Sequence, residues 1–417
     1  MITFESLKSA LPEKGLFRGK ELPFLLSPEP FRLEPKEVKH LEGLGRTLFS
    51  FQQACDRIYK RSKKEKITPW VAETLDTGKP LWLIEAQSKE PYINALPRVI
   101  RPDLLLTEDG YALTELDSVP GGIGLTAWLQ QQYSDSPSMI EGFRSLAPEG
   151  MAIQVSEEAS DYKPEMQWLS EQLGEQWHCV NAEDGEVFDQ NYRFFELFDW
   201  ENIPTVKQFC HEEISPPLKP HLEEKLWLAF LHTPSLQSIW KEELREKKIR
   251  QLKKIVPFGW VVDPSPLPPH SSLPKLNTHT WEAVKEFSQK ERELVLKVSG
   301  FSEKAWGSRG VTIGHDCSSK QWSEAIDEAT ESFESNPYIL QRFADTKLVD
   351  HPYYDPDTGE VKIMKGRVRL CPYYFVSSDY QEVKLGGVLV TINPADKKKI
   401  HGMRDAILTV LELEIEN

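Results

Sequence analysis

The sequence predicts a mixed α/β chain of the α+β type, and three kinds of segment support this prediction. Between Glu37 and Thr74, apolar residues recur at helical spacing, which indicates a helical N-terminal segment. Over residues 150–181 and 293–343, short apolar strands alternate with amphipathic helices. Residues 100–117 form two alternating runs around a turn, a pattern typical of a β-hairpin. With 417 residues and 39% hydrophobic content, the chain can bury a large core and divide into two or three lobes.

The elements follow one another in a clear order. Residues 1–36 are rich in proline and predicted to be irregular. The helical segment follows, and its apolar stripe consists of Leu41, Leu44, Leu48, Phe51, Ala54 and Ile58. The next predicted elements are a hairpin at 101–122, a helix at 124–133, strands at 150–156 and 177–180 around a helix at 166–173, and a strand entering an aromatic corner at 192–203.

The C-terminal half continues with helices and antiparallel strands. Two helices separated near Pro234 are expected over 222–254, and the proline-rich stretch 257–274 is expected to be a loop or hinge. The remaining predicted elements are a compact unit at 293–343 (strand, glycine-containing loop, strand, helix, strand), a hairpin ending near 376, a strand at 384–392 and a terminal helix from about Met403.

Charge and cysteine usage exclude several classes of protein. The net charge of -15 argues against a nucleic-acid partner, which needs clustered cations. Five scattered cysteines without a C-x-x-C pair favour a reduced, cytoplasmic protein without zinc or a disulfide framework. The N-terminus does not resemble a signal peptide, and no apolar run is long enough to span a membrane. No H-E-x-x-H or G-x-S-x-G motif is present.

The hairpin gathers charged residues on one face. With a three-residue loop closed by Gly110 in the left-handed conformation, Asp103 faces Glu115 and Arg101 faces Asp117. A two-residue loop would shift the register by one and separate Asp103 from the other acids. The apolar alternation favours the first register, in which the opposite face carries Ile100, Leu104, Leu106, Ala112 and Leu116.

Three acids on one face repel one another unless a positive charge lies among them. Oxygen ligands of this kind suit magnesium, which bridges carboxylates to substrate phosphates. Asp103, Glu115 and Asp117 are therefore predicted to bind one or two magnesium ions. The alternative is a solvated face on which acids keep an edge strand soluble.

A glycine-containing loop and two lysines point to phosphate. Gly300, Gly307 and Gly310 lie between two predicted strands, where backbone N–H groups could close over phosphates. Lys297 ends an apolar strand and must reach a polar partner or solvent. Lys247 lies in a charged helix, for which a solvated face is the simpler explanation. The alternative for the loop is an ordinary hairpin connection.

A competing motif begins at Gly122, where GIGLTA matches the dinucleotide fingerprint G-x-G-x-x-A. Glu115 and Asp117 lie just before it and would repel a pyrophosphate, and Pro120 interrupts the turn. A dinucleotide site, and with it a nicotinamide-dependent oxidoreductase, is therefore less well supported than a metal site.

Several blocks together resemble glutathionylspermidine synthetases and their circularly permuted ATP-grasp relatives. The blocks are R-x-D from Arg101, E-x-D from Glu115, FELFDWE at 195–201, WKEELREK at 240–247, VLK…GSRGVTIG, YILQRF at 338–343 and R-x-C-P-Y from Arg369. They occur in the family's order and span about residues 95–395.

The resemblance implies a permuted ATP-grasp fold with a helical N-terminal segment (1–94), a metal-binding hairpin with an α/β region (95–220) and nucleotide-binding lobes (221–417). The implied magnesium ligands are Asp103, Glu115 and Asp117. The implied ATP contacts are Lys247, Lys297, Ser308, Arg309, Gly310 and Val311 at the phosphates, and Gln341, Arg342 and Phe343 at the adenine. Arg101 and Arg369 correspond to residues at the reacting phosphate.

Some positions depart from the family pattern. Asp117 replaces an asparagine, Glu246 stands where an asparagine precedes the lysine, and Pro120 lies one residue closer to the acids. Glutathione and spermidine are therefore not carried over. The expected function is an ATP-dependent carboxylate–amine ligase that forms an acyl phosphate from small-molecule substrates. The alternative is a catalytically silent nucleotide-binding protein that keeps the fold.

Overall fold

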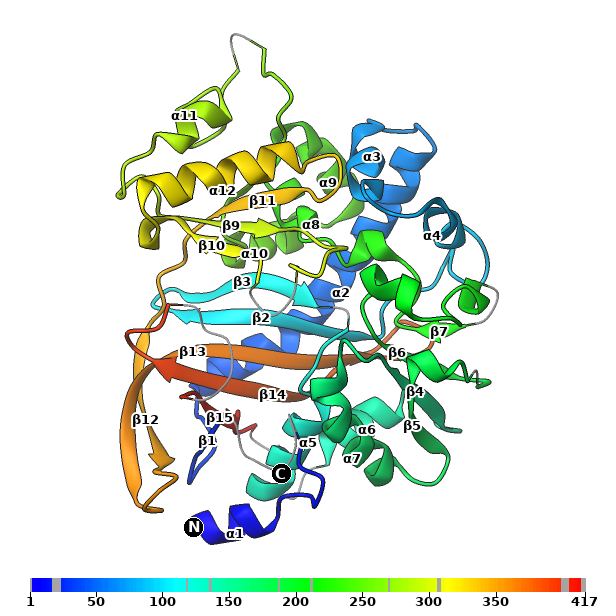
Figure 1. Cartoon of the computed structure of the whole chain (residues 1–417), viewed down its shortest axis with the longest axis vertical. Helices are drawn as coiled ribbons and strands as arrows, with labels where there is room; N and C mark the ends of the chain where they lie inside the picture. The colour runs from blue at the N-terminus through cyan, green and yellow to red at the C-terminus, as the bar shows by residue number, and fades with distance from the viewer. Residues whose placement is uncertain are drawn as a thin grey trace. The chain divides into compact units, whose positions relative to one another are not determined.

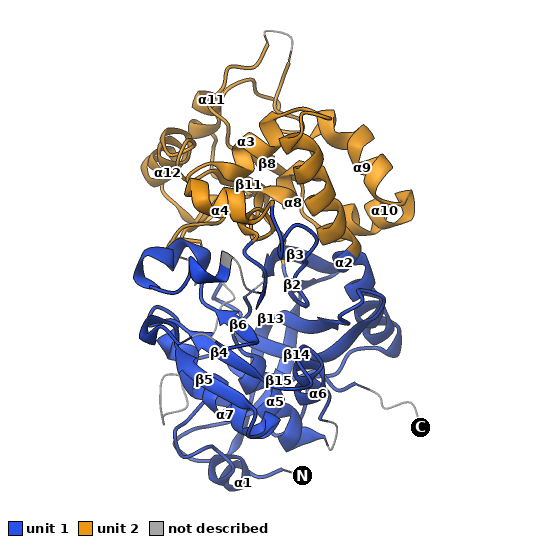
Figure 2. Ribbon diagram, turned by 90° about the vertical axis from the view of Figure 1, so that its right-hand side faces the viewer, with its two compact units in different colours: residues 1–49, 89–218, 346–417 blue, residues 50–88, 219–345 orange. Residues whose placement is uncertain are grey.

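The computed structural model describes residues 2–16, 24–117, 119–134, 137–186, 188–210, 213–268, 271–305, 309–398 and 405–413. The chain divides into two compact units (Figure 2). Unit 1 contains residues 1–49, 89–218 and 346–417, and unit 2 contains 50–88 and 219–345. The chain passes between the units four times. The three consecutive segments expected from the sequence stay a prediction.

Unit 1 is built on a seven-stranded sheet, as counted over the described residues. Its order is β1-β15-β14-β13-β2-β3, with β12 also paired to β13 (Figure 1). The strands are β1 (Leu25–Leu26), β2 (Val99–Thr107), β3 (Gly110–Asp117), β12 (Leu348–Tyr354), β13 (Val361–Val376), β14 (Val383–Pro394) and β15 (Ile407–Val410). The pairing of β2 with β13 joins segments more than 260 residues apart in the sequence.

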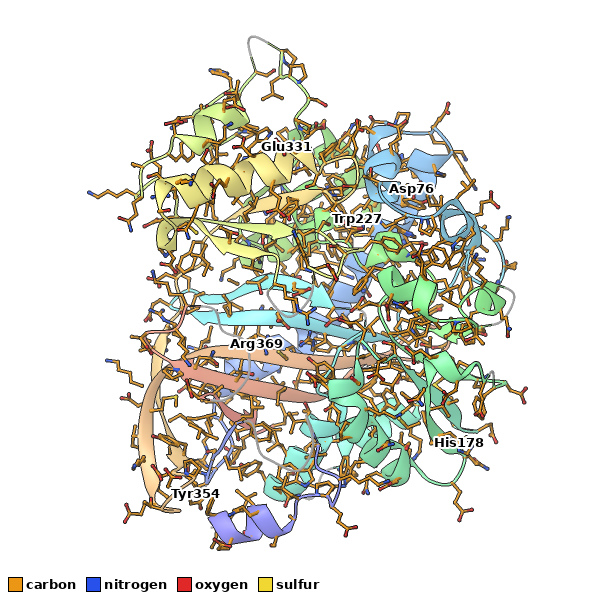
Figure 3. All side chains as sticks on the ribbon, in the orientation of Figure 1. Asp76, His178, Trp227, Glu331, Tyr354 and Arg369 are labelled. Carbon is orange, nitrogen blue, oxygen red and sulfur yellow. The ribbon has the colours of Figure 1, made fainter. Side chains whose placement is uncertain are left out.

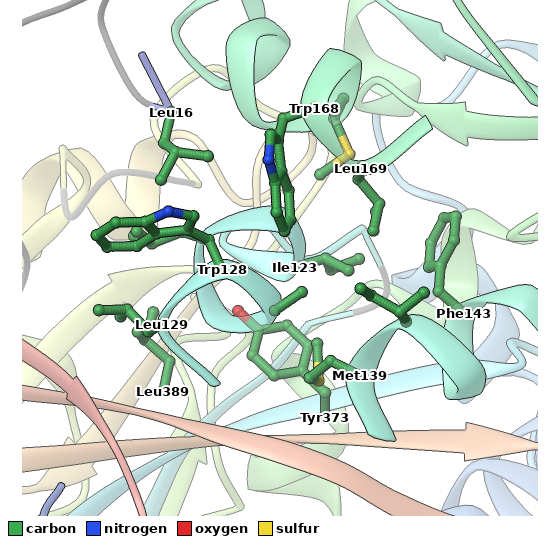
Figure 4. Packing of buried hydrophobic residues seen from close by; sticks show 14 of the residues in the cluster. Leu16, Ile123, Trp128, Leu129, Met139, Phe143, Trp168, Leu169, Tyr373 and Leu389 are labelled. Carbon is green, nitrogen blue, oxygen red and sulfur yellow. The ribbon is translucent and has the colours of Figure 1, made fainter. Parts of the chain in front are cut away.

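A second, parallel sheet in unit 1 has the order β5-β4-β6-β7. Its strands are β4 (Met151–Val155), β5 (Trp177–Asn181), β6 (Asn191–Phe194) and β7 (Ile214–Ser215). The helices of unit 1 include α1 (Phe4–Ser9), the first half of α2 (Pro35–Lys63), α5 (Ile123–Tyr133), α6 (Ser138–Arg144) and α7 (Lys163–Leu173). The apolar side chains of α1, α5, α6 and α7 form one large core with Tyr373 and Leu389 of the first sheet (Figure 4).

Unit 2 contains an antiparallel sheet of order β10-β9-β11-β8. Its strands are β8 (Gly259–Val261), β9 (Leu294–Val298), β10 (Val311–Ile313) and β11 (Tyr338–Arg342). Its helices include the end of α2, α3 (Trp70–Asp76), α4 (Leu81–Ala86), α8 (Leu226–Phe230), α9 (Gln237–Glu243), α10 (Glu246–Ile255), α11 (Trp281–Lys285) and α12 (Ser319–Glu331). Trp322 and Ile326 of α12 are fully buried against one face of this sheet.

Most predicted elements are present, and the predicted stripe of α2 is buried as expected. Four predictions are wrong in whole or in part. The expected C-terminal helix from Met403, insofar as it lies within the described residues, is replaced by the buried strand β15. The expected loop over 257–274 contains β8, and the region 222–254 forms three α-helices rather than two. The segment 1–36 was expected to be irregular, but it contains the short helix α1.

Within the described part of the chain, no helix has the length and apolar character that crossing a membrane requires.

Candidate active site

The β2–β3 hairpin has the predicted pairing of its charged residues, but its turn differs from the predicted one. Thr107 pairs with Gly110, so the turn contains only Glu108 and Asp109 rather than the three residues expected. The ladder then shifts by one residue between Asp103 and Leu104, because Thr114 is bulged out of the pairing.

The bulge restores the predicted arrangement of charges. Beyond it, Asp103 pairs with Glu115 and Arg101 with Asp117, as predicted. Directly opposed residues project from the same face of a sheet. Between the turn and the bulge, the side chains of β3 point to the faces opposite to those predicted. Leu104 pairs with Leu113, and Ala112 pairs with Leu105. Ala112 was therefore assigned to the wrong face, and Leu113 takes its place.

Two arginines hold the buried carboxylate of Asp103. Arg101 Nη1 lies 3.2 Å from Asp103 Oδ1, and Arg369 Nη1 donates to Asp103 Oδ2 at 3.0 Å. Arg101 also pairs through Nη2 with Asp117. The Nε groups of both arginines are buried and have no hydrogen-bond partner among the described residues. The described protein groups therefore leave these two guanidinium N–H donors unused.

Electrostatics keep this cluster ionised. Burial by itself would raise the pKa of Asp103, but Arg101 and Arg369 outweigh it, and the pKa is lowered from its ordinary value. The pKa of Arg101 is raised, because Asp103 and Asp117 outweigh its burial. Both guanidinium groups are thus cationic at every physiological pH.

Strand β13 carries three of the residues around this cluster, and Figure 3 labels Arg369 on it. Arg369 pairs with Leu105, and the same register places Cys371 opposite Asp103 and Tyr373 opposite Arg101. Burial raises the pKa of the Cys371 thiol to about 11, so the thiol is neutral and lies 3.5 Å from Asp103 Oδ1. Cys371 and Tyr373 were missed as site residues, although their spacing from Arg369 by two and four places all three on one face.

The predicted magnesium ligands are engaged with protein groups. Both oxygens of Asp103 face arginines, and Asp117 Oδ1 accepts the N–H of Val119 at 2.8 Å. Among the described residues, no group of three or more His, Cys, Asp or Glu side chains is arranged to hold a metal ion. Carboxylate oxygens fit magnesium in kind, but an ion bound to both aspartates would replace the pairs with Arg101. The magnesium site stays a prediction.

In unit 2, Lys297 and Gln341 lie on one face of the antiparallel sheet. Lys297 pairs with Val311 on one side and Ile339 on the other, and its Nζ donates to Gln341 Oε1 at 3.1 Å. Both residues are buried, and within the described residues Gln341 Nε2 has no hydrogen-bond partner. These two predicted nucleotide residues are therefore brought together by β9 and β11.

The other predicted adenine residues take different positions. Arg342 donates to the carbonyl of Lys275 at 2.7 Å, and its guanidinium lies 5.7 Å from the Trp260 ring centre. The Phe343 ring meets His315 edge-on, with centroids 4.6 Å apart. Alternation along β11 thus places Arg342 on the face opposite to Gln341.

The predicted phosphate loop is closed by its own backbone. Gly310 donates its N–H to the carbonyl of Lys304 at 2.8 Å and accepts from the N–H of Val298 at 3.2 Å. A Cβ at Gly310 would lie 2.7 Å from the Lys304 carbonyl oxygen, so this close approach requires glycine. Arg309 is exposed. Ser308 and Gly307 lie outside the described residues.

The sequence analysis did not identify the residues that anchor this loop. Lys225 Nζ donates to the carbonyl of Ala305 at 2.9 Å and lies 3.4 Å from that of Ser299. Glu224 bonds the Ser299 hydroxyl and pairs with the buried ammonium of Lys79 at 2.5 Å. These contacts join segments distant in the sequence, so no local pattern signals them. Lys247, near the start of α10, is exposed.

Two backbone donors of the dinucleotide motif at Gly122 are already occupied by a carboxylate. Glu165 of α7 accepts the N–H of Gly122 at 2.7 Å and that of Leu125 at 2.8 Å. A pyrophosphate at this helix N-terminus would need these same groups. The structure therefore argues against the nicotinamide alternative.

Comparison with known proteins gives structural matches only. No family model matches the chain, and no curated protein matches it in sequence. A glutathione synthetase-like effector from Globodera pallida, solved in its apo form, superposes with a TM-score of 0.57 over 98% of this chain and 96% of its own, at 11% identity. A structure described as a putative gamma-glutamylcysteine synthetase from Methylobacillus flagellatus gives a TM-score of 0.41 at 10% identity, over 84% of each chain. The chain therefore has a mixed α/β, ATP-grasp-like fold similar to that of the glutathione synthetase-like effector, as the sequence predicted.

Proposed function

We propose that this protein is an ATP-dependent carboxylate–amine ligase that forms an acyl phosphate and releases ADP and phosphate. One observation carries the proposal: Arg101 and Arg369 converge on Asp103, and their buried Nε donors have no partner in the part of the chain that the structure describes. A charged, donor-rich cluster of this kind suits the oxygens of a transferring phosphoryl group. The ATP-grasp-like fold agrees with this chemistry, although it does not identify the substrates.

The reaction needs ATP because a carboxylate is a poor acyl donor. A carboxylate oxygen attacks the γ-phosphorus of ATP, the bond to the β-phosphate oxygen breaks, and ADP leaves. The amine nitrogen then attacks the acyl carbon, the C–O bond to phosphate breaks, and the amine loses a proton. The protein's part is to position the reactants and neutralise charge.

The residues divide this work between them. Arg101 and Arg369 are proposed to hold the transferring phosphoryl group and the acyl-phosphate oxygens, because a guanidinium binds such oxygens bidentately. Lys297 and Lys247 are proposed to contact the ATP phosphates, and Gln341 to bind the adenine. Magnesium, held by Asp103, Glu115 and Asp117, would supply further neutralisation of the triphosphate.

Product analysis over a panel of carboxylic acids and amines tests the reaction. We expect ADP and phosphate to be released only when an acid is present, and amide to form when an amine is added. AMP and pyrophosphate as products would contradict the acyl phosphate.

The Arg369→Ala variant tests the proposed phosphoryl site. We expect it to bind ATP normally and to lose turnover by on the order of a hundred-fold or more, since a positioned donor to the transition state is removed. Lys365→Ala is the matched control, because Lys365 lies on the same strand and is exposed. Normal turnover in Arg369→Ala would remove this residue from the proposed machinery.

The Lys297→Ala variant tests the nucleotide site independently. We expect weaker ATP binding by calorimetric titration, whereas the exposed Lys290→Ala variant keeps the original affinity. Unchanged affinity in Lys297→Ala would place ATP elsewhere.

One observation favours a second function, nucleotide binding without catalysis. The oxygens of Asp103 are already occupied by arginines, and Lys247 is exposed rather than held in a site. Tight ATP binding without phosphate release from any acid in the panel would support this function.

A further inference from the structure

The loop that links β3 to α5 begins at Asp117 and controls how this carboxylate points. Asp117 Oδ1 accepts the N–H of Val119 at 2.8 Å, and the other oxygen pairs with Arg101. The side chain is therefore fixed from two sides, by an arginine and by the loop. Any displacement of Val119 must reorient the carboxylate or break this hydrogen bond.

Glu165 holds the far end of this loop. It is fully buried on α7, and its two oxygens accept the N–H groups of Gly122 and Leu125 at 2.7 and 2.8 Å. Gly122 is the N-cap residue of α5, with φ of 86°, and has no side chain to cap the helix itself. A carboxylate from another helix thus provides the capping interaction that is normally local.

Two tyrosines hold the middle of the loop. The Tyr373 hydroxyl donates to the carbonyl of Gly121 at 2.6 Å. A Cβ added at Gly121 would lie 2.4 Å from the Tyr162 ring, and one added at Gly122 would lie 2.7 Å from the Tyr373 hydroxyl. Glycine is required at both positions by these close approaches. The loop is therefore fixed at Gly121 and Gly122 by side chains from three other elements.

We infer that Glu165, together with Tyr373, is a positioning residue that orients Asp117 and Arg101 for the reaction. Tyr373 lies on the same strand face as Arg369 and opposite Arg101, so the side chain that holds the loop also borders the arginine cluster. This inference rests on the proposed function, which assigns Arg101 to the transferring phosphoryl group and Asp117 to magnesium. Glu165 acts through these residues and does not itself touch substrate.

The protonation state of Glu165 gives this positioning a pH dependence. Only the carboxylate can accept both N–H groups, because the protonated acid places an O–H against one of them. Burial raises the pKa of Glu165 to about 7. The two backbone N–H groups and Arg101 lower this pKa, but burial has the larger effect. The other titratable groups that interact with Glu165 are Tyr162 and Tyr373, and both stay neutral because burial raises their pKa. Turnover should therefore fall as the pH drops through about 7.

The Glu165→Gln variant tests the inference, with Glu171→Gln as the matched control. Glu171 lies on the same helix and is exposed, so the charge change is the same. We expect Glu165→Gln to lower kcat by about ten-fold or more, as supporting residues around a reactive group do, with little change in KM for ATP. The variant should also lose the decrease in turnover near pH 7, because the amide cannot titrate.

A double-mutant cycle identifies the residue through which Glu165 acts. In an Asp117→Asn background, Glu165→Gln should reduce turnover further by less than two-fold. An equal reduction in both backgrounds, or a pH profile of Glu165→Gln identical to that of the wild type, would overturn the inference. The pH profile decides the matter alone if Asp117→Asn is too slow to measure.

Amide hydrogen exchange distinguishes failure of this inference from failure of the proposed function. Exchange at Val119–Leu125 should accelerate in Glu165→Gln, and at Val119–Gly122 in the milder Tyr373→Phe variant, which covers the case in which Glu165→Gln does not fold. Unchanged exchange in both variants would contradict the positioning role. Accelerated exchange in a protein without ligase turnover would contradict the proposed function only.

Discussion

Asp103 balances the charges of the arginine cluster in unit 1. Its two oxygens face Arg101 and Arg369, and it is 7% exposed. Without this negative charge, the neighbouring guanidinium groups of Arg101 and Arg369 would repel each other. A buried ion pair is costly to break from one side, because the remaining charge stays desolvated.

The Asp103→Asn variant should therefore lower the free energy of unfolding by about 3 kcal/mol at neutral pH. The pKa of Asp103 is lowered below its ordinary value of 3.8, so its contribution is fully present above that value. The contribution is lost as the pH falls through the lowered pKa. Denaturant unfolding of the wild type and the variant across this pH range measures the difference.

Asp109→Asn is the control for this experiment, because Asp109 is an exposed residue of the hairpin turn. It should change stability by less than about 0.5 kcal/mol. Equal effects of the two substitutions would show that Asp103 has no special role in the cluster.

Sequence reasoning identified part of the site at the scale of single residues. It placed Arg101 and the three acids on one face, as they are, but through a three-residue turn. In the structure a two-residue turn and the unpredicted bulge at Thr114 together produce this arrangement. The pairing of Arg369 with Asp103 depends on β13 lying beside β2, which no local pattern reveals; the family resemblance indicated only that Arg369 belongs to the active site. Glu165 carried no signal, since it caps a helix from 40 residues away.

At the scale of elements, α12 shows how local signals define a helix. Ser318 accepts the N–H of Gln321 at 3.2 Å, and Gln321 accepts the N–H of Ser318 at 3.0 Å, so both form a capping box. The helix then buries Trp322 and Ile326 against the sheet of unit 2.

Ser318→Ala should lower the free energy of unfolding by about 1 kcal/mol, because the N–H of Gln321 in the first turn loses its acceptor, the Ser318 hydroxyl. Thermal or denaturant unfolding measures this loss. Ser319→Ala, at the first helical position, is the control, and it should be nearly neutral. A larger loss in Ser319→Ala would show that the capping box does not stabilise the helix.

The elements that sequence reasoning missed are short and depend on tertiary context. Strand β15 was assigned to a helix because a short apolar run has no decisive period. Its residues are buried between β14 and β1, so pairing rather than local preference determines their conformation. Strand β8 has three residues between prolines, and only its ladder with β11 makes it a strand.

At the scale of the whole molecule, both units are assembled from separate parts of the chain. Unit 2 combines residues 50–88 with 219–345, and one boundary falls inside α2. Composition and loop positions along the sequence cannot reveal such grouping, because it depends on which segments pack together. The mixed α/β class was predictable, since it depends only on the kinds of elements present.

Binding of ATP should stabilise the folded protein as a whole. A ligand present at about 100 times its Kd adds about 2.7 kcal/mol to the free energy of unfolding. We expect ATP with magnesium to raise the Tm in a thermal shift assay, and Lys297→Ala to reduce this increase. An equal increase with NADH would contradict the nucleotide preference that we propose.

The bulge at Thr114 has a consequence for how the hairpin can change its length. A side chain's face depends on whether an odd or even number of residues separates it from the turn. The two-residue turn and the one-residue bulge together place Glu115 and Asp117 beside Asp103 and Arg101. Any relative of this chain, natural or engineered, that gains one residue in the turn must therefore lose the bulge. An insertion in the turn and a deletion at the bulge should occur together.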